Sequence, residues 1–161
     1  MKRFLKIAIP VFILGFAAGN AFWYLASPLW IDQVVSESLP SELQVSEVAS
    51  GSFRGADSSH KGSGNVQVLR TEGGAGLVRL TEFQVTNGPD LEVWLVANPD
   101  PQTSQDVKTS EWVSLGQLKG NIGDQTYNVL ADVDLSDFGS VVIWCEQFGV
   151  LFSPASLAFQ G

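Results

Sequence analysis

The first candidates for chemistry in this 161-residue chain are its only cysteine, Cys145, and its only histidine, His60. A deprotonated thiol can act as a nucleophile, a redox group or a metal ligand, and an imidazole can serve as its base or as a second ligand. Nucleophilic catalysis at Cys145 would need His60 as the base and a third residue to orient that base. The competing interpretation is an inert buried thiol, because Val142 and Trp144 place Cys145 inside an apolar run.

Ligands for a metal or a cofactor are scarce in the rest of the chain. There is no Cys-x-x-Cys-His motif for covalent haem, no pair of histidines for zinc, and no methionine after Met1. Cys145 and His60 are too few for a four-coordinate structural site but sufficient for axial ligation of haem. We therefore predict no metal site, and we interpret Asp132-Val133-Asp134 as a solvated turn with calcium binding as its minor alternative.

Three tryptophans follow the amino-terminal segment: Trp94, Trp112 and Trp144. Each is either a core residue or part of a sugar-binding platform. We expect Trp144 to lie in the core, and Trp112 to be partly exposed because it follows the long polar segment from Asn98 to Ser110.

The elements that position these residues are predicted to be β-strands. The continuous apolar run from Val141 to Cys145 is typical of a buried strand. Phe148, Val150 and Phe152 then alternate with other residues, which predicts a second strand with these three on one face. The intervening Glu146-Gln147-Phe148-Gly149 would form a tight connection or a bulge.

The chain after Gly51 has the sequence pattern of strands and turns throughout. Short apolar runs are separated by Gly, Pro, Asn and Asp, and Asn87-Gly88-Pro89-Asp90 has the residue types of a tight turn. We predict an all-β domain over residues 51–161, an antiparallel β-sandwich or barrel of about seven or eight strands.

The amino-terminal residues 1–30 have the features of a membrane anchor. Three cations precede the run from Ile7 to Leu25, which contains 19 residues without a charge. As a helix this run would span about 28 Å, close to the thickness of a bilayer core. We therefore predict one transmembrane helix before the β domain, with residues 31–50 as a juxtamembrane spacer that could include a short helix.

The flanking residues predict how this anchor is oriented. Lys2, Arg3 and Lys6 favour a cytoplasmic amino terminus. Trp23, Tyr24 and Trp30 suit the aromatic belt at the far interface. The β domain would then be periplasmic or extracellular. A cleaved signal peptide is the alternative, because Gly19-Asn20-Ala21 offers small residues to a signal peptidase, but the apolar run continues beyond that point.

Charge narrows the range of partners. After Trp30 the chain has six cations and all 17 carboxylates, a net charge of −11. An acidic domain of this kind is a poor match for nucleic acid, and we predict no nucleic-acid partner. A single cysteine also leaves the domain without an internal disulfide.

Together these motifs resemble the DM-thirteen electron-transfer domain family, in its single-domain, membrane-anchored bacterial type. The resemblance covers residues 50–159 and rests on the following segments: Gly51-Ser52-Phe53, His60-Lys61-Gly62-Ser63-Gly64, Leu80 with Phe83, Asn87-Gly88-Pro89-Asp90-Leu91, Leu115-Gly116, Lys119-Gly120, Gly123 to Tyr127, and Val141 to Cys145 with Phe148. The Asn-Gly-Pro-Asp turn combined with the Trp-Cys strand is the specific part of the match.

The resemblance implies a redox role centred on the cysteine, either as a free thiol or as the ligand of a prosthetic group such as haem. On this chain that role would fall on Cys145, with His60 as its candidate partner and a redox protein as the exchange partner. We expect an electron-transfer or binding domain rather than a catalyst with its own turnover. The alternative is a non-enzymatic module that recognises a protein or carbohydrate through its loops, notably residues 98–110.

Overall fold

The computed structural model describes residues 2–27 and 30–160. Met1, Pro28, Leu29 and Gly161 lie outside the described residues, and with them parts of the predicted anchor (1–30) and the last residue of the predicted domain (51–161). The chain divides into two compact units, residues 1–31 and residues 32–161, which are described separately.

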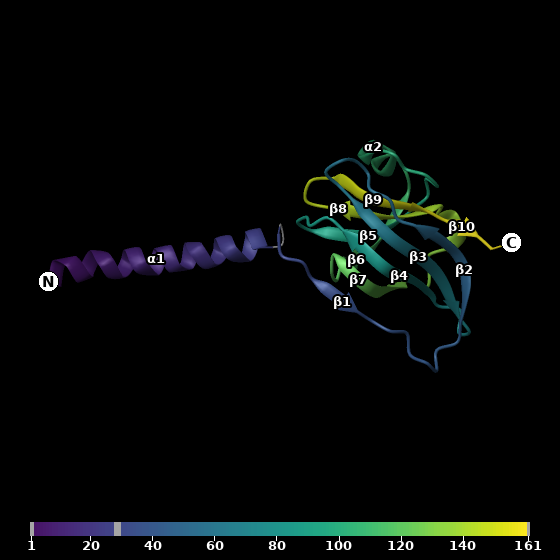
Figure 1. The fold of residues 1–161 in the computed structure, drawn as a ribbon, viewed down its shortest axis with the longest axis horizontal. Helices are drawn as coiled ribbons and strands as arrows, with labels where there is room; N and C mark the ends of the chain where they lie inside the picture. The colour runs from purple at the N-terminus through teal and green to yellow at the C-terminus, as the bar shows by residue number, and fades with distance from the viewer. Residues whose placement is uncertain (1, 28–29, 161) are drawn as a thin grey trace. The chain divides into compact units, whose positions relative to one another are not determined.

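The first unit contains the helix α1, Lys2–Ala26 (Figure 1). Its segment Arg3–Tyr24 has a mean hydropathy of 1.7 and is long and apolar enough to cross a membrane. The large apolar side chains of this segment are mostly exposed, as a lipid-facing helix requires. The predicted helix is therefore confirmed and could anchor the protein in a membrane, although a signal sequence has the same length and composition.

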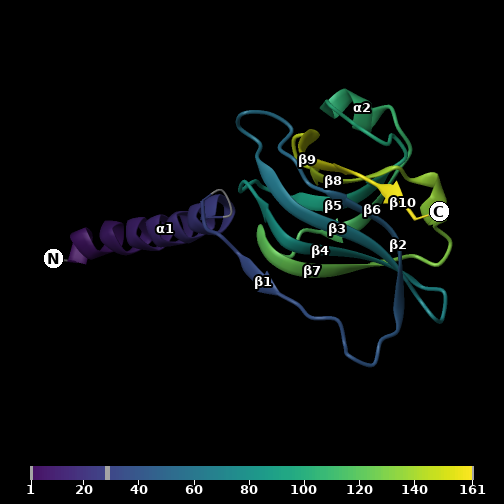
Figure 2. The same ribbon diagram turned by 45° about the vertical axis from the view of Figure 1, so that its right-hand side comes forward.

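The second unit is a β-sandwich of two sheets (Figures 1 and 2). The larger sheet contains, in spatial order, β1 (Val34–Ser36), β7 (Ile122–Val129), β4 (Gly76–Val85), β3 (Gly62–Thr71), β2 (Val45–Ser52) and β10 (Ala158–Phe159). The smaller sheet contains β6 (Trp112–Gln117), β5 (Leu91–Val96), β8 (Ser140–Cys145) and β9 (Val150–Ser156). The predicted all-β sandwich is confirmed. Within the described residues it has ten strands rather than seven or eight, because β1 and β10 are too short to show any periodicity.

The segment expected to be a spacer, residues 31–50, contributes strands to the larger sheet. β1 pairs in parallel with β7, with Val34 opposite Ile122, and β2 begins at Val45. The expected short helix is absent from this segment, all of which the structure describes. Side chains distant in sequence hold β1 in place: Glu37 accepts hydrogen bonds from Lys119 Nζ at 2.8 and 3.0 Å.

Two apolar clusters lie on opposite faces of the smaller sheet. The main core fills the space between the sheets and includes Val141, Ile143 and Cys145 of β8. The second cluster, on the outer face, contains Trp94, Val96, Val107, Val142, Trp144 and Leu151. Because successive residues of a strand point to opposite faces, Cys145 faces the main core and Trp144 faces the outer cluster.

Short helical elements lie in two of the connections. Within the polar segment 98–110, α2 (Ser104–Lys108) is closed by a capping box between Thr103 and Asp106, and its Val107 is fully buried in the outer cluster. This segment is therefore anchored to the sheet. A single 3₁₀ turn, η2 (Leu135–Asp137), precedes β8.

Candidate functional site

Cys145 is the last residue of β8 and lies at one end of the main core. Its side chain is fully buried, and Sγ donates a hydrogen bond of 3.1 Å to the carbonyl oxygen of Pro89. Directly after it, Glu146 to Gly149 form the predicted tight connection, in which Gly149 adopts a φ of +61° and Phe148 is 64% exposed. The thiol is thus enclosed, but it lies at the end of a strand rather than in its middle.

The cover of the thiol is the Asn87-Gly88-Pro89-Asp90 turn, which we call the Pro89 turn. Asp90 has a φ of +51°, which is uncommon for a residue other than glycine. Its carbonyl accepts a hydrogen bond from the Glu146 N–H at 3.0 Å. Gly88 packs so closely on Phe152 that a β-carbon there would lie 2.7 Å from the Phe152 ring. The turn itself is half-buried to exposed, so the hydrogen-bond partner of Cys145 belongs to a surface segment.

His60 is half-exposed and is held by Asp57. The Asp57 carboxylate accepts hydrogen bonds from His60 Nδ1 at 2.8 Å and from the N–H groups of Ser59 and His60 at 2.7 and 2.8 Å. These bonds, led by that of the imidazole, lower the pKa of Asp57 to about 2. The described hydrogen bonds of residues 2–27 and 30–160 include none between His60 and Cys145.

His60 packs against Phe152, a residue of the apolar cluster that also contains Cys145. The His60 ring lies 4.2 Å from the Phe152 ring, measured between centroids. The loop after His60 also meets the strand end before the turn, since the Thr86 N–H donates to the Lys61 carbonyl at 2.9 Å. The structure therefore gathers the His60 loop, the Pro89 turn and Cys145 at one end of the sandwich.

The Pro89 turn is also tied to the residues that follow the helix unit. Asn87 Nδ2 donates a hydrogen bond of 3.0 Å to Asp32 Oδ1, and Asn121 Nδ2 donates one of 2.8 Å to the same oxygen. A cavity of about 550 Å³ adjoins this contact and is lined in part by Asp32, Lys61, Asn87 and Asn121.

Burial controls the protonation of the thiol. Removal of Cys145 from water raises the pKa of its thiol, and the nearby carboxylate of Asp90 acts in the same direction. The N–H groups of Phe148 and Gln147 act against this shift but do not cancel it. In the closed structure Cys145 is a protonated, hydrogen-bonded thiol and a poor nucleophile.

The enclosed thiol does not fit haem. An axial ligand needs an open coordination face, but Sγ of Cys145 is buried and donates its hydrogen bond to the Pro89 carbonyl. Within residues 2–27 and 30–160, no group of three or more His, Cys, Asp or Glu side chains is placed to hold a metal ion. Cys145 and His60 stay predicted redox residues, and we derive no chemistry through a prosthetic group.

The tryptophans form a stack on the outer face of the smaller sheet. Trp94 and Trp112 are 3.9 Å apart between ring centroids with an interplanar angle of 11°, and Trp144 lies 5.1 Å from Trp94. Trp144 is 2% exposed and Trp112 46% exposed, as expected from their positions in the sequence. The stack was not predicted, since it depends on which strands are neighbours.

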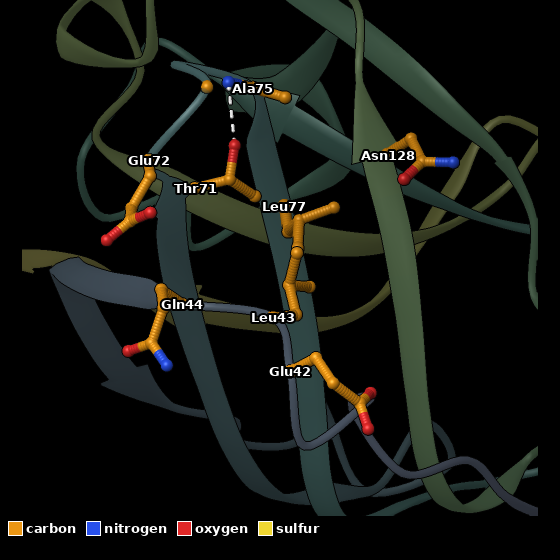
Figure 3. Close-up of a pocket in the computed structure, with 9 residues that line it drawn as sticks. Glu42, Leu43, Gln44, Thr71, Glu72, Ala75, Leu77 and Asn128 are labelled. Carbon is orange, nitrogen blue, oxygen red and sulfur yellow. Dashed lines mark hydrogen bonds between the residues drawn. The ribbon is translucent and has the colours of Figure 1, made fainter.

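A second cavity lies away from all of these residues, between the segment before β2 and the β3–β4 hairpin. It has a volume of about 490 Å³. Figure 3 shows Leu43 and Leu77 near its centre, with the carboxylates of Glu42 and Glu72 on opposite sides. None of the residues singled out in the sequence lines it.

Comparison with models of known protein families identifies the family of the chain. The family model described as Electron transfer DM13 matches residues 52–157, which is most of the sandwich. The protein belongs to the DM13 family. The match includes His60, the Pro89 turn, the tryptophan stack and Cys145, and the family name indicates an electron-transfer role. No curated protein and no solved structure matches the chain.

Several residues of this DM13 site were missed in the sequence. Asp57 stands three residues before His60, and an Asp at that spacing is a local signal for a side chain that caps its own loop. Phe152 was predicted to share one strand face with Phe148 and Val150. Phe148 instead lies in the connection before β9, and the contact of Phe152 with His60 requires the tertiary fold. Asp32 gave no signal at all, because its partners Asn87 and Asn121 are remote in sequence.

Proposed function

We propose that this DM13 protein is a membrane-anchored electron-transfer domain in which the thiol of Cys145 is the redox group, closed off by the Pro89 turn and exposed when that turn opens. The observation that carries the proposal is the position of the thiol. Sγ is fully buried, yet its hydrogen-bond partner belongs to a surface turn and not to a strand of the sheet.

The chemistry that a lone thiol can carry out is exchange with the disulfide of a redox partner protein. Opening of the turn breaks the bond to Pro89 and exposes Sγ to water, which lets the thiol lose its proton. The thiolate then attacks one sulfur of the partner disulfide and releases the other as a thiolate. Cys145 ends in a mixed disulfide, so it is oxidised while the released partner sulfur is reduced.

His60 acts as a positioning residue in this proposal. Its ring packs on Phe152, and the Phe152 ring in turn supports Gly88 of the Pro89 turn. Asp57 fixes the orientation of the imidazole through the bond to Nδ1. Loss of the His60 ring would loosen the cover of the thiol without removing the redox group.

The location of the domain follows from the anchor. The cations at Lys2, Arg3 and Lys6 favour a cytoplasmic amino terminus, which would export the β-sandwich to the periplasm or the extracellular space. A disulfide-bearing partner is common in such an oxidising compartment. Partner and substrate would then meet the domain on the outer side of the membrane.

The test is the rate at which a maleimide labels Cys145 in the full chain at increasing urea concentration. If opening is local, labelling of the native protein is nearly independent of urea at low concentration, because little surface is exposed. Asn87→Ala, which removes the bond to Asp32, should accelerate labelling about tenfold, a change of about 1.4 kcal/mol in the opening equilibrium.

The control is Asn65→Ala, which removes an exposed hydrogen bond from Ser52 on the larger sheet and should leave labelling unchanged. A labelling rate that is proportional to the globally unfolded fraction at every urea concentration would contradict the proposal. Cys145 would then be a packing residue.

Recognition of a carbohydrate or protein through residues 98–110 is the second candidate function. It is supported by Trp112, whose ring is half-exposed next to that segment. A Trp112→Ala variant that loses binding to a glycan or protein array, with labelling of Cys145 unchanged, would favour this alternative.

A further inference from the structure

The tryptophan stack contains one indole whose proton has a defined acceptor. Trp94 Nε1 donates a hydrogen bond of 2.7 Å to Oε2 of Glu92, and Ser114 Oγ donates one of 2.7 Å to the same oxygen. A donor to acceptor distance of 2.7 Å is short for a nitrogen donor and typical of a bond to an ionised carboxylate. In the described part of the chain, no other tryptophan donates to a side-chain carboxylate.

The rings around Trp94 differ in their exposure and in their charge surroundings. Trp112 stacks face to face on Trp94 at 3.9 Å and is 46% exposed, so it connects Trp94 with solvent. Trp144, on the other side, is 2% exposed and has Lys108 Nζ 5.8 Å from its ring centroid. A positive charge on Trp144 would be repelled by that ammonium group, whereas one on Trp94 faces Glu92.

We propose that Trp94 and Glu92 form a proton-coupled one-electron redox site that reacts with a high-potential one-electron oxidant through Trp112. The oxidant takes one electron from Trp112, and Trp94 then reduces the oxidised Trp112 by one electron. The Nε1 proton of Trp94 moves to Oε2 of Glu92 as this occurs. The products are a neutral Trp94 radical, a protonated Glu92 and the oxidant reduced by one electron.

This site goes beyond the thiol exchange proposed for Cys145 and does not depend on it. Trp144 and Cys145 are consecutive in β8 but face opposite sides of the sheet, so the two sites lie on different faces. Glu92 is within the reach that proton transfer requires before any oxidation takes place. The Trp94–Glu92 hydrogen bond is therefore already in place for the proton transfer, and the two side chains need to move little.

The experiment uses the full chain in detergent and tris(bipyridine)ruthenium(III), generated by a laser flash, as the oxidant. The exposed tryptophans and tyrosine of the first unit are replaced by Trp23→Phe, Tyr24→Phe and Trp30→Phe, which leaves the stack as the only tryptophans. Transient absorption separates a neutral tryptophan radical from its cation. We expect the neutral radical, formed more slowly in deuterium oxide than in water.

Two substitutions in this background test the two parts of the site. Glu92→Gln keeps a hydrogen-bond acceptor but cannot take the proton, so the radical should appear as the cation, and at least about tenfold less neutral radical should form. Trp112→Phe should slow formation at least about tenfold, because Trp94 itself is only 4% exposed. Circular dichroism checks that both variants are folded.

Ser114→Ala is the matched control. It removes the other hydrogen bond to Glu92 Oε2 but keeps the bond from Trp94, so the neutral radical should persist. An unchanged yield of neutral radical in Glu92→Gln, or an unchanged rate in Trp112→Phe, would overturn the proposal. The absence of an isotope effect in the parent chain would do the same without any substitution in the stack. Because Cys145 takes no part, these results leave the labelling test of the thiol independent.

Discussion

At the scale of single residues, the reactivity of the Cys145 thiol is limited mainly by its burial beneath the Pro89 turn. Burial and Asp90 both raise the pKa of the thiol, so the closed protein holds it in the unreactive protonated form. The same enclosure limits oxidation of the thiol, which matters if the domain is exported as proposed. In the proposed mechanism, the reactivity of the thiol therefore depends on how often the Pro89 turn opens.

Replacement of Cys145 by serine should lower the free energy of unfolding by about 1 to 3 kcal/mol, because a hydroxyl is more costly to bury than a thiol. The value should fall near the low end if the serine hydroxyl keeps the bond to the Pro89 carbonyl. Urea denaturation followed by circular dichroism measures this difference. Cys145→Ala provides the comparison without a polar atom, and a serine variant as stable as the wild type would show that the sulfur is reached by water.

The Asp57–His60 pair should make stability depend on pH in the acid range. The folded pKa of Asp57 is about 2, below its ordinary value of 3.8, so the carboxylate contributes stability that is present above pH 3.8 and lost as pH falls through 2. Asp57→Asn should therefore flatten the pH dependence of the unfolding free energy between these two values. Urea denaturation across this range measures it. An unchanged pH dependence in Asp57→Asn would contradict this prediction.

At the scale of elements, the end of the sandwich that holds the site is closed by segments that meet only in the fold. Phe152 of β9 supports Gly88, and Asp32, just before β1, binds Asn87 of the same turn. The cover of the thiol thus rests on a strand of the smaller sheet and on the segment that leads into β1.

The attachment of β1 should depend on Gly123. This glycine has a φ of +101°, and a β-carbon at its position would overlap the backbone oxygen of Val35 in β1. Gly123→Ala should therefore destabilise the domain by more than about 1 kcal/mol and increase hydrogen exchange of β1 amides. Gly116→Ala is the matched control, because Gly116 has a φ of +105° with open space around it. Equal effects of the two substitutions would mean that backbone strain alone is responsible.

The sequence predicts those elements whose signal is local. The strand Val141–Cys145 is a continuous apolar run, and the connection at Glu146–Gly149 contains the glycine that its geometry requires, so both are recognisable without a structure. β1 is held by partners remote in the chain, such as Lys119 for Glu37, and its three residues show no pattern. For this reason residues 31–50 were interpreted as a spacer.

In the candidate site, too, the sequence identifies some features and only the fold provides the others. Cys145 and His60 are identifiable because each is the only residue of its type, but the contacts that define them, with Pro89 and Asp57, are set by folding. The tryptophans lie in predicted strands, yet their stacking requires β6, β5 and β8 to be neighbours in that order. Strand order is a long-range property that no single stretch of sequence encodes.

At the scale of the whole molecule, the chain separates a cationic and apolar start from an acidic domain. The carboxylates all follow Trp30, and the apolar segment Arg3–Tyr24 could anchor the protein in a membrane. The sandwich begins at Asp32, almost directly after the helix unit in the sequence, so one residue that binds the Pro89 turn also lies in the segment that joins the two units.

Two truncations test this arrangement. A chain that begins at Asp32 should leave the membrane fraction, fold as a soluble domain, and label at Cys145 as slowly as the full chain, because β1 and the Asp32–Asn87 bond are kept. A chain that begins at Ser38 loses β1, Asp32 and the Glu37–Lys119 pair. It should be less stable by about 2 kcal/mol or more, since each lost hydrogen bond contributes about 1 kcal/mol. Its thiol should label faster, because the Pro89 turn has lost the hydrogen bond between Asn87 and Asp32.

Fractionation, urea denaturation and maleimide labelling measure the three effects. If both truncated chains label at the same slow rate, the segment before β1 does not hold the turn closed, and the cover of Cys145 must rest on Phe152 and His60 alone.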